Sequence, residues 1–207
     1  KLSLNTGSDY NTLMSKGGNL VDKRVYDKCV EYYEKSGEND FINVVYDACT
    51  IDEMCATIHY EMERYKKEDG TYTNMLITMD HSALFRVGKM QKDKFEMLGS
   101  LGEALTMMKK KYPVAFVVLS QLNRNIDAPD RQRDGEYGNY VLDSDIYGSD
   151  ALLQHADVVM GINKPSLRKI RQYGPERFLI NDEDILVFHF LKSRNGTTRI
   201  SFFKLDR

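Results

Sequence analysis

The chain has 207 residues, of which 42% are hydrophobic and 29% charged, and its formal net charge is -2. These values predict one globular domain with a substantial core, and they exclude an overall basic surface, so any nucleic-acid contact must be local. No apolar run approaches the roughly 20 residues of a membrane span, so we expect no membrane association. We also expect a cytoplasmic protein with reduced thiols, because Cys29, Cys49 and Cys55 form no CxxC pair.

The first two predicted elements are a helix and a strand. Apolar and aromatic side chains share one helical face between residues 21 and 35, and Gly37 is typical of a helix end. That face consists of Val25, Cys29, Tyr32 and Tyr33. Residues 41–47, "FINVVYD", then predict a short apolar strand.

A capping box predicts the start of the second helix. Thr50 is followed three residues later by Glu53, a pattern in which each side chain accepts a hydrogen bond from the other residue's backbone N–H. The apolar stripe of this helix consists of Met54, Ile58 and Met62. After a turn, residues 74–80, "NMLITMD", predict a buried strand that ends at Asp80.

A long helix and another strand follow. A polar loop over residues 81–94 leads into a helix over residues 95–112, whose terminal lysines suit the negative end of a helix dipole. Pro113 then starts the run "PVAFVVLSQLNR", an apolar strand whose polar tip includes Gln121. We expect this strand to be buried on both sides, as strands of parallel sheets usually are. A polar tip on such a strand is where α/β proteins place ligands.

The C-terminal part begins with a polar stretch. Residues 122–147 predict a long polar loop, and loops of this length are usually functional or disordered. Asn195-Gly196 is a strong hairpin signal between the last two strands. The other predicted elements are a short helix, a strand, a surface insertion and those two strands, over residues 148–157, 157–163, 163–183, 185–194 and 198–206.

The order of these elements predicts an α/β fold, a mostly parallel sheet covered by helices with antiparallel C-terminal strands. Ligands of such sheets lie beyond the carboxyl ends of the strands, where Asp80 and Gln121 are found. A carboxylate there can orient the water shell of a hard cation, and an amide can donate to a phosphate oxygen. Taken alone, either residue is equally compatible with a simple turn cap.

Two cations near the C-terminus form a third feature. Lys192 and Arg194 alternate with Ser193, so both are expected on one face of the strand. Paired cations on an apolar sheet are typical of phosphate binding, in which Arg supplies a bidentate fork and Lys a point charge. The alternative is a solvated strand end beside a hairpin.

Together these strings carry a family resemblance. "SQLNR", "SDALLQHADVVM" and "LKSRNG", in this order, resemble the ATPase domain of DnaB-type replicative DNA helicases, hexameric motors with a RecA-like core. The resemblance covers residues 47–204, and residues 1–207 would form a single RecA-like domain. It implies ATP and Mg²⁺ as ligands, single-stranded DNA as substrate, a homo-oligomer that is a hexamer, and primase or a helicase loader as partner. The setting it implies is the cytoplasm of a bacterium or of a phage-infected bacterial cell.

The resemblance also implies roles for individual residues. Asp80 would hold magnesium through water, and Gln121 would sense the γ-phosphate and couple it to the DNA-binding loop. Arg194 would be an arginine finger with Lys192 as its companion, both reaching the nucleotide of a neighbouring subunit. The DNA-binding residues would be Arg86, Lys89, Arg124, Asn125, Arg131, Arg133, Tyr147 and Gly148.

The sequence departs from the family in three places. It contains no GxxxxGK[ST] phosphate loop, so we expect either a piece of a longer helicase or a degenerate relative, and no appreciable ATP turnover by this chain alone. Residues 147–150 stand where the family commonly has Arg-Glu-Ser-Gly, which removes the usual arginine from the DNA face. His81 replaces a residue that is often Tyr, and we interpret it as structural.

Two other functions remain open. A RecA- or RadA-like recombinase shares a strand-end Asp and a loop after a polar strand tip, although the "KSRNG" string favours the helicase. A non-catalytic RecA-like DNA-binding adaptor would be consistent with the missing phosphate loop if the chain were complete.

Overall fold

The computed structural model describes residues 22–37, 42–128, 131 and 140–205. The chain divides into two units, residues 1–47 and residues 48–207, and each is described by itself. The first unit contains α3 (Lys23–Gly37), which ends at the predicted glycine. Asp22 precedes this helix, and its carboxylate accepts a hydrogen bond of 2.7 Å from the backbone N–H of Arg24.

The strand predicted for residues 41–47 is wrong for the part that the structure describes. Phe41 lies outside the described residues, and residues 42–47 form no strand. Ile42, Val45 and Tyr46 are all exposed. An apolar run becomes a strand only when a neighbouring strand pairs with its backbone groups, and none of the described strands pairs with this one.

The second unit begins with the predicted capping box. α4 (Ile51–Arg64) starts after Thr50, whose hydroxyl accepts a hydrogen bond of 3.3 Å from the backbone N–H of Glu53. The Glu53 carboxylate accepts one of 2.8 Å from the backbone N–H of Thr50 in return. The predicted apolar stripe of Met54, Ile58 and Met62 is buried, so both the start and the inward face of this helix are confirmed.

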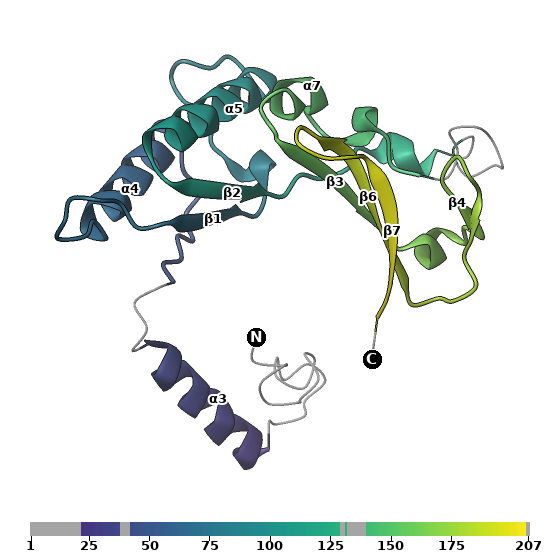
Figure 1. The fold of residues 1–207 in the computed structure, drawn as a ribbon, viewed down its shortest axis with the longest axis horizontal. Coiled ribbons are helices and arrows are strands. Elements are labelled where there is room, and N and C mark those ends of the chain that lie inside the picture. Colours follow the sequence, from purple (N-terminus) through teal and green to yellow (C-terminus); the bar gives the residue numbers. More distant parts are fainter. Residues whose placement is uncertain (1–21, 38–41, 129–130, 132–139, 206–207) are drawn as a thin grey trace. The chain divides into compact units, whose positions relative to one another are not determined.

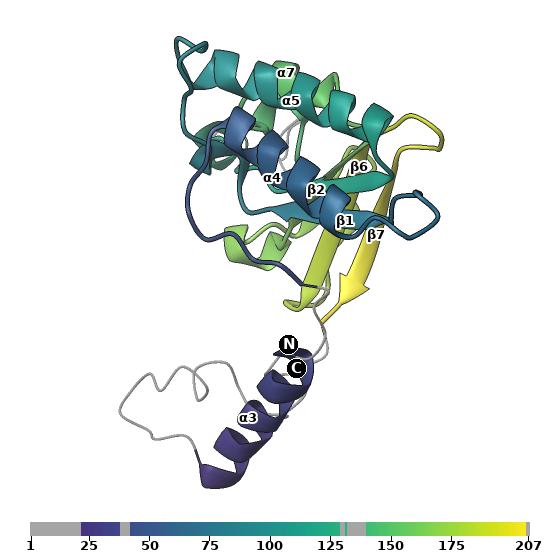
Figure 2. The same cartoon turned by 90° about the vertical axis from the view of Figure 1, so that its left-hand side faces the viewer.

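Two parallel strands and a long helix form the centre of this unit. β1 (Met75–Met79) pairs in parallel with β2 (Val114–Val118), and α5 (Lys94–Lys111) connects them. α4 and α5 lie over one face of this strand pair, as Figures 1 and 2 show from two directions. The core beneath the helices includes the fully buried side chains of Met97, Leu98 and Leu101. No described helix is long and apolar enough to span a membrane.

The expectation that β2 is buried on both sides is wrong, and β1 is likewise covered on one side only. Their side chains alternate, and only every second one packs against the helices. On the opposite face Leu76 is 65% exposed and Val117 is 46% exposed. The helices cover one face only, so the strand is buried on a single side although its sequence is a continuous apolar run.

An antiparallel sheet forms the C-terminal part. β3 (Val158–Asn163), β6 (Ile185–Ser193) and β7 (Arg199–Lys204) lie in the order β3-β6-β7. β6 and β7 are joined through Asn195-Gly196, and Phe190 pairs with Arg199 next to this turn, so the predicted hairpin is confirmed. The unit is therefore α/β with parallel and antiparallel strands, as predicted.

A second, smaller core lies beside this sheet. The predicted insertion holds a turn of 3-10 helix and a two-stranded hairpin, β4 (Gln172–Tyr173) and β5 (Phe178–Leu179). Tyr173 has no exposed surface and meets the His189 ring at a centroid distance of 6.3 Å. A short helix, α7 (Ser149–Leu153), precedes β3 and packs against α5.

The polar loop is closed at its base by hydrogen bonds. The backbone N–H of Tyr147 donates to the carbonyl oxygen of Gln121 at 3.0 Å, and that of Asn123 donates to Asp145 at 2.6 Å. Between them Leu122 and Ile146 form an antiparallel bridge. The polar tip of β2 therefore pairs with the end of the loop that follows it.

An ion pair holds the same loop from inside. The two terminal nitrogens of Arg131 donate to the two carboxylate oxygens of Asp145, each at 2.9 Å, and one of them also reaches the carbonyl oxygen of Tyr140 at 3.0 Å. The backbone N–H of Leu142 donates to the same carboxylate at 2.8 Å. Asp145 is only 1% exposed, so its charge is balanced almost entirely by these partners.

We predict that Asp145→Ala destabilises the protein by about 3 kcal/mol or more, because it leaves the Arg131 guanidinium without its buried partner. Urea unfolding measures the change. The control is Asp127→Ala, which removes the exposed partner of Arg168 and should cost about 1 kcal/mol at most. Equal losses in the two variants would contradict a buried role for Asp145.

We also predict that His189 makes stability depend on pH. Burial lowers the pKa of His189, against a smaller opposing effect of Asp143, and its Nδ1 is buried without a described partner. The unfolded chain therefore binds the proton more readily than the folded one. The stability that depends on neutral His189 is fully present above about pH 6.5 and is lost as the pH falls through the lowered pKa. Urea unfolding should show that the free energy of unfolding decreases less between pH 7.5 and pH 5.5 for His189→Phe than for the wild type.

Candidate functional site

The parallel pairing of β1 and β2 brings Asp80 and Gln121 to one edge of the sheet. Met79 is in register with Val118, so both strands end at the same level. Two hydrogen bonds of 2.9 Å continue the contact beyond the strand ends, from Leu119 N to the Met79 carbonyl oxygen and from Ser82 N to the Leu119 carbonyl oxygen. The two residues predicted from separate strand tips are therefore neighbours in space.

His81 makes the side-chain contact between these tips. The amide nitrogen of Gln121 lies 3.2 Å from His81 Nε2. For the amide to donate, the imidazole must carry its proton on Nδ1, which is buried without a partner among the described residues. The sequence predicted a structural His81 but gave no sign of this contact, because the two residues are 40 positions apart.

Asp80 has a carboxylate that is available for a ligand. The residue is exposed, and no hydrogen bond or ion pair with another described residue occupies it. No cluster of three or more His, Cys, Asp or Glu side chains that could hold a metal occurs in the described parts of the chain. A single free carboxylate fits magnesium, which usually keeps several waters and binds one or two carboxylates together with substrate phosphates.

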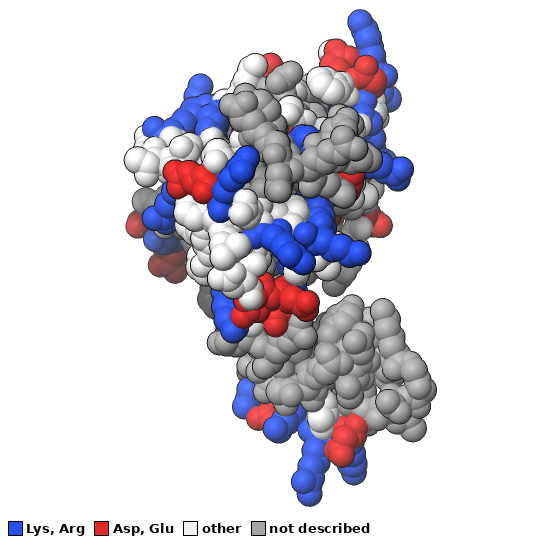
Figure 3. Space-filling view, turned by 90° about the vertical axis from the view of Figure 1, so that its right-hand side faces the viewer, with Lys and Arg blue, Asp and Glu red and all other residues white. Residues whose placement is uncertain are grey.

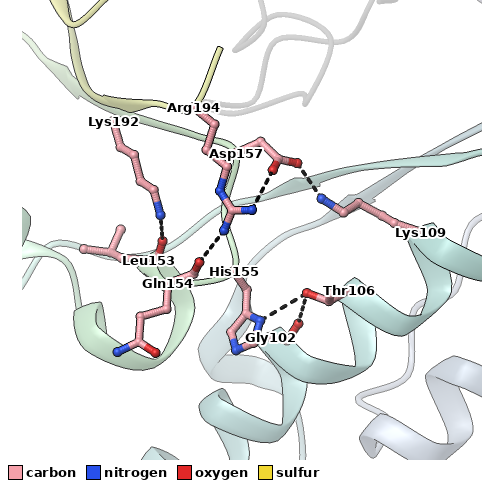
Figure 4. A network of polar contacts seen from close by, with 9 residues as sticks. All are labelled: Gly102, Thr106, Lys109, Leu153, Gln154, His155, Asp157, Lys192 and Arg194. Carbon is pink, nitrogen blue, oxygen red and sulfur yellow. Dashed lines mark hydrogen bonds and ion pairs between the residues drawn. The ribbon is translucent and has the colours of Figure 1, made fainter. Parts of the chain in front are cut away.

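Lys192 and Arg194 lie together at the end of α7 (Figure 4). The ammonium group of Lys192 donates to the Leu153 carbonyl oxygen, and the Arg194 guanidinium donates to that of Gln154 at 2.6 Å. Both acceptors are carbonyls at the C-terminal end of α7, the negative end of a helix, where cations are favourable. The side chain of Arg194 remains 50% exposed.

Asp157 joins this cluster, although no motif in the sequence points to it. One carboxylate oxygen lies 3.6 Å from Arg194, and the other accepts a hydrogen bond from Lys109 of α5. The Lys109 ammonium, with smaller contributions from Arg194 and Lys192, holds the pKa of Asp157 below its usual value. Lys109 is one of three consecutive lysines, and nothing local distinguishes it from the other two.

The predicted DNA contacts from the two loops differ in availability. Arg86 is 58% exposed on its side chain and pairs with Glu53 at 2.7 Å. Lys89 and Arg124 are exposed, and neither has an ion-pair partner among the residues that the structure describes. Both loops leave the sheet at the same edge, since β1 and β2 are parallel.

The remaining candidates are held by the fold or lie outside the described residues. Arg131 is engaged by Asp145, as described above. Tyr147 is 42% exposed, whereas Gly148 is buried with a φ of 69°, and a Cβ there would lie 2.3 Å from Leu98 Cδ1. The packing of α7 on α5 is thus sufficient reason for this glycine. Arg133 and the side chain of Asn125 lie outside the described residues.

On the face shown in Figure 3, Lys and Arg side chains lie in several separate groups with acidic side chains beside them. This pattern agrees with the net charge of -2 and favours local contacts with a polyanion over a single broad basic face.

A family model and solved structures match this chain. The sequence matches the DnaB-like helicase C-terminal domain over residues 10–205, whereas no curated protein matches the chain. A solved structure described as an ATPase domain superposes with a TM-score of 0.74 at 15% identity, over 97% of this chain and 63% of that one. A DnaB-like replicative helicase, solved to examine its interactions with primase, superposes with a TM-score of 0.72 at 16% identity. The match covers 97% of this chain and 43% of that one.

These matches establish the fold and the family. At 15% and 16% identity the structural likeness shows the fold alone, which is that of RecA-like DnaB ATPase domains. The chain spans less than two thirds of either solved protein. The family match, in contrast, extends over nearly the whole sequence. The chain belongs to the DnaB-like helicase C-terminal domain family.

Proposed function

We propose that this chain is part of the motor domain of an ATP-dependent replicative helicase that translocates on single-stranded DNA and unwinds duplex DNA, in a bacterial or phage-infected cell. The observation that carries the proposal is the meeting of Asp80 and Gln121 at one sheet edge, in a domain of this family. A free carboxylate and an amide at one edge can serve a single phosphate ligand from two sides.

Each strand tip has a defined task in this proposal. Asp80 would hold magnesium through its water shell, and the ion would offset charge on the phosphate oxygens of ATP. Gln121 donates from its amide to the γ-phosphate. The backbone carbonyl of Gln121 also accepts a hydrogen bond from Tyr147, so a movement of Gln121 is transmitted to the base of the polar loop.

Lys192 and Arg194 act on the nucleotide of a neighbouring subunit. Their contacts with the end of α7 use only some of their N–H groups, since a guanidinium has five donors and an ammonium three. The free donors of the half-exposed Arg194 can stabilise charge that develops on a phosphoryl group during its transfer. Action between subunits requires an oligomer, for which we propose a hexamer.

DNA contacts come from the two loops at the same edge. Lys89 and Arg124 have no ion-pair partner among the described residues, and Arg86, in the same loop as Lys89, is exposed although it pairs with Glu53. These groups suit phosphates, and the half-exposed ring of Tyr147 suits stacking on a base. Arg131 contributes by holding the polar loop through Asp145.

Primase or a helicase loader is the proposed partner. One of the similar structures is a DnaB-like helicase studied for its interactions with primase, which supports the choice of class.

We predict that Arg194→Ala, mixed into the wild-type full-length protein, lowers DNA-stimulated ATP turnover more steeply than its fraction of subunits. The reason is that each altered subunit removes the arginine from its neighbour's site. In a pure Arg194→Ala oligomer the loss should be about 1,000-fold or more. Steady-state ATP hydrolysis at several mixing ratios measures the effect.

The outcomes of this mixing experiment separate the candidate functions. Turnover proportional to the wild-type fraction would mean that Arg194 acts within its own subunit or not at all. No turnover by the wild-type full-length protein would favour the DNA-binding adaptor. Turnover without unwinding of forked DNA, but with strand exchange, would favour a recombinase.

We further predict that Lys89→Ala with Arg124→Ala weakens single-stranded DNA binding and lowers the slope of log affinity against log salt by about 1.4, since each phosphate contact on a single strand contributes roughly 0.7. Fluorescence anisotropy at several salt concentrations provides the measurement. Lys67→Ala is the control, because Lys67 is exposed near the other end of β1. A slope unchanged by the double variant would exclude these loops from the DNA interface.

A further inference from the structure

Asp157 holds Arg194 through both its main chain and its side chain. The Asp157 carbonyl oxygen accepts a hydrogen bond of 2.9 Å from the backbone N–H of Arg194. One carboxylate oxygen faces the guanidinium at 3.6 Å (Figure 4). The first contact fixes the position of the Arg194 backbone, and the second constrains the direction in which its side chain extends.

Lys109 in turn holds Asp157. Its ammonium group donates to the second carboxylate oxygen, so the first oxygen stays turned toward Arg194. Lys109 belongs to the last turn of α5, the helix whose other side chains fill the main core, and the helix provides a rigid support. The carboxylate is thus shared between a fixed cation on the core helix and a half-exposed cation on the hairpin.

A second contact ties the same junction to α5. His155 Nδ1 and Thr106 Oγ1 lie 3.1 Å apart, and the Thr106 hydroxyl also donates to the Gly102 carbonyl oxygen at 3.0 Å. A Cβ at Gly102 would lie 2.5 Å from the His155 ring, so the glycine permits this approach. The segment between α7 and β3 therefore cannot shift easily relative to α5.

We propose that Asp157, anchored by Lys109, is a positioning residue that orients the Arg194 guanidinium toward the nucleotide of the neighbouring subunit. This inference rests on the proposed function, since it assigns a task to Asp157 only if Arg194 acts between subunits.

The charges of the cluster and the flexibility of an arginine side chain both favour the view that Asp157 positions Arg194 rather than neutralising it. The cluster contains three cations, Lys109, Lys192 and Arg194, and the single carboxylate of Asp157, so it stays net positive toward a phosphate. An arginine on a surface hairpin has many accessible rotamers, and a group placed about 1 Å from its productive position can lose roughly 100-fold in rate. The Asp157 and Gln154 contacts select one orientation before the nucleotide arrives.

The test is Asp157→Asn in the full-length protein. This substitution keeps the size of the side chain but removes the charge that attracts Arg194 and Lys109. We expect kcat for DNA-stimulated ATP hydrolysis to fall about 10-fold, less than for Arg194→Ala, because the arginine is present but misdirected. The KM for ATP should change less than about twofold, since the subunit's own nucleotide site is intact. Asp157→Glu should restore part of kcat.

A matched control separates positioning from folding. Asp182 also pairs with a lysine, Lys204, at 2.6 Å, but it lies just before the start of β6, at the opposite end of that strand from Arg194. Asp182→Asn should leave kcat within about twofold of the wild type, since exposed ion pairs contribute little. Thermal unfolding of the Asp157 and Asp182 variants should be alike; a large loss of stability for Asp157→Asn alone would overturn the inference in favour of a purely structural role.

Complementation decides whether Asp157 acts across the subunit interface. We would mix Asp157→Asn subunits with Asp80→Asn subunits, which lack a working site but present a correctly held arginine. Activity above the sum of the two pure oligomers supports the inference, because intact sites then receive well-positioned arginines. Absence of such activity overturns it.

The same mixture with Arg194→Ala in place of Asp157→Asn tests the proposed function itself. If that mixture fails to regain activity, Arg194 does not act between subunits, and the proposed function and this inference both fall. If it regains activity while the Asp157 mixture does not, only the inference falls. An increase in kcat for Asp157→Asn would also overturn it, because Asp157 would then restrain the arginine.

Discussion

The structure depends most on the parallel pairing of β1 with β2. Parallel neighbours cannot be joined by a tight turn, so the chain must cross over through a long segment, here the 18 residues of α5. That helix covers one face of the strands and supplies much of the core. The same pairing makes both strands end at one edge, which is why Asp80 and Gln121 meet although 40 residues separate them.

From Gln121 a continuous set of contacts leads to the C-terminal hairpin. Its carbonyl oxygen holds Tyr147, the next residue begins the approach to α7, and the last carbonyls of α7 accept hydrogen bonds from Lys192 and Arg194. Buried Gly148 lets α7 pack closely on α5. A short helix supported by the core thus lies between the residues proposed for one nucleotide site and those proposed for the next.

Several of the features that the sequence could predict are local ones. The capping box of Thr50 and Glu53 and the turn at Asn195-Gly196 each depend on residues a few positions apart, and both were predicted correctly. The strand at residues 41–47 and two-sided burial of β2 depend on what packs beside them, which no local pattern encodes. The contact between Lys109 and Asp157 spans 48 residues and leaves no periodic signal.

Arg131 and Arg194 show how similar residues receive different tasks from their surroundings. The Arg131 guanidinium meets a carboxylate that is 1% exposed, with two bonds of 2.9 Å, so its charge is neutralised inside the loop. The side chain of Arg194 is half exposed, and its carboxylate partner lies 3.6 Å away and is shared with a lysine. A cation whose partner is shared keeps attraction for a phosphate, whereas one in a closed bidentate pair must first break that pair. This difference in pairing, which the sequence does not display, ties Arg131 into the fold and is consistent with the role proposed for Arg194.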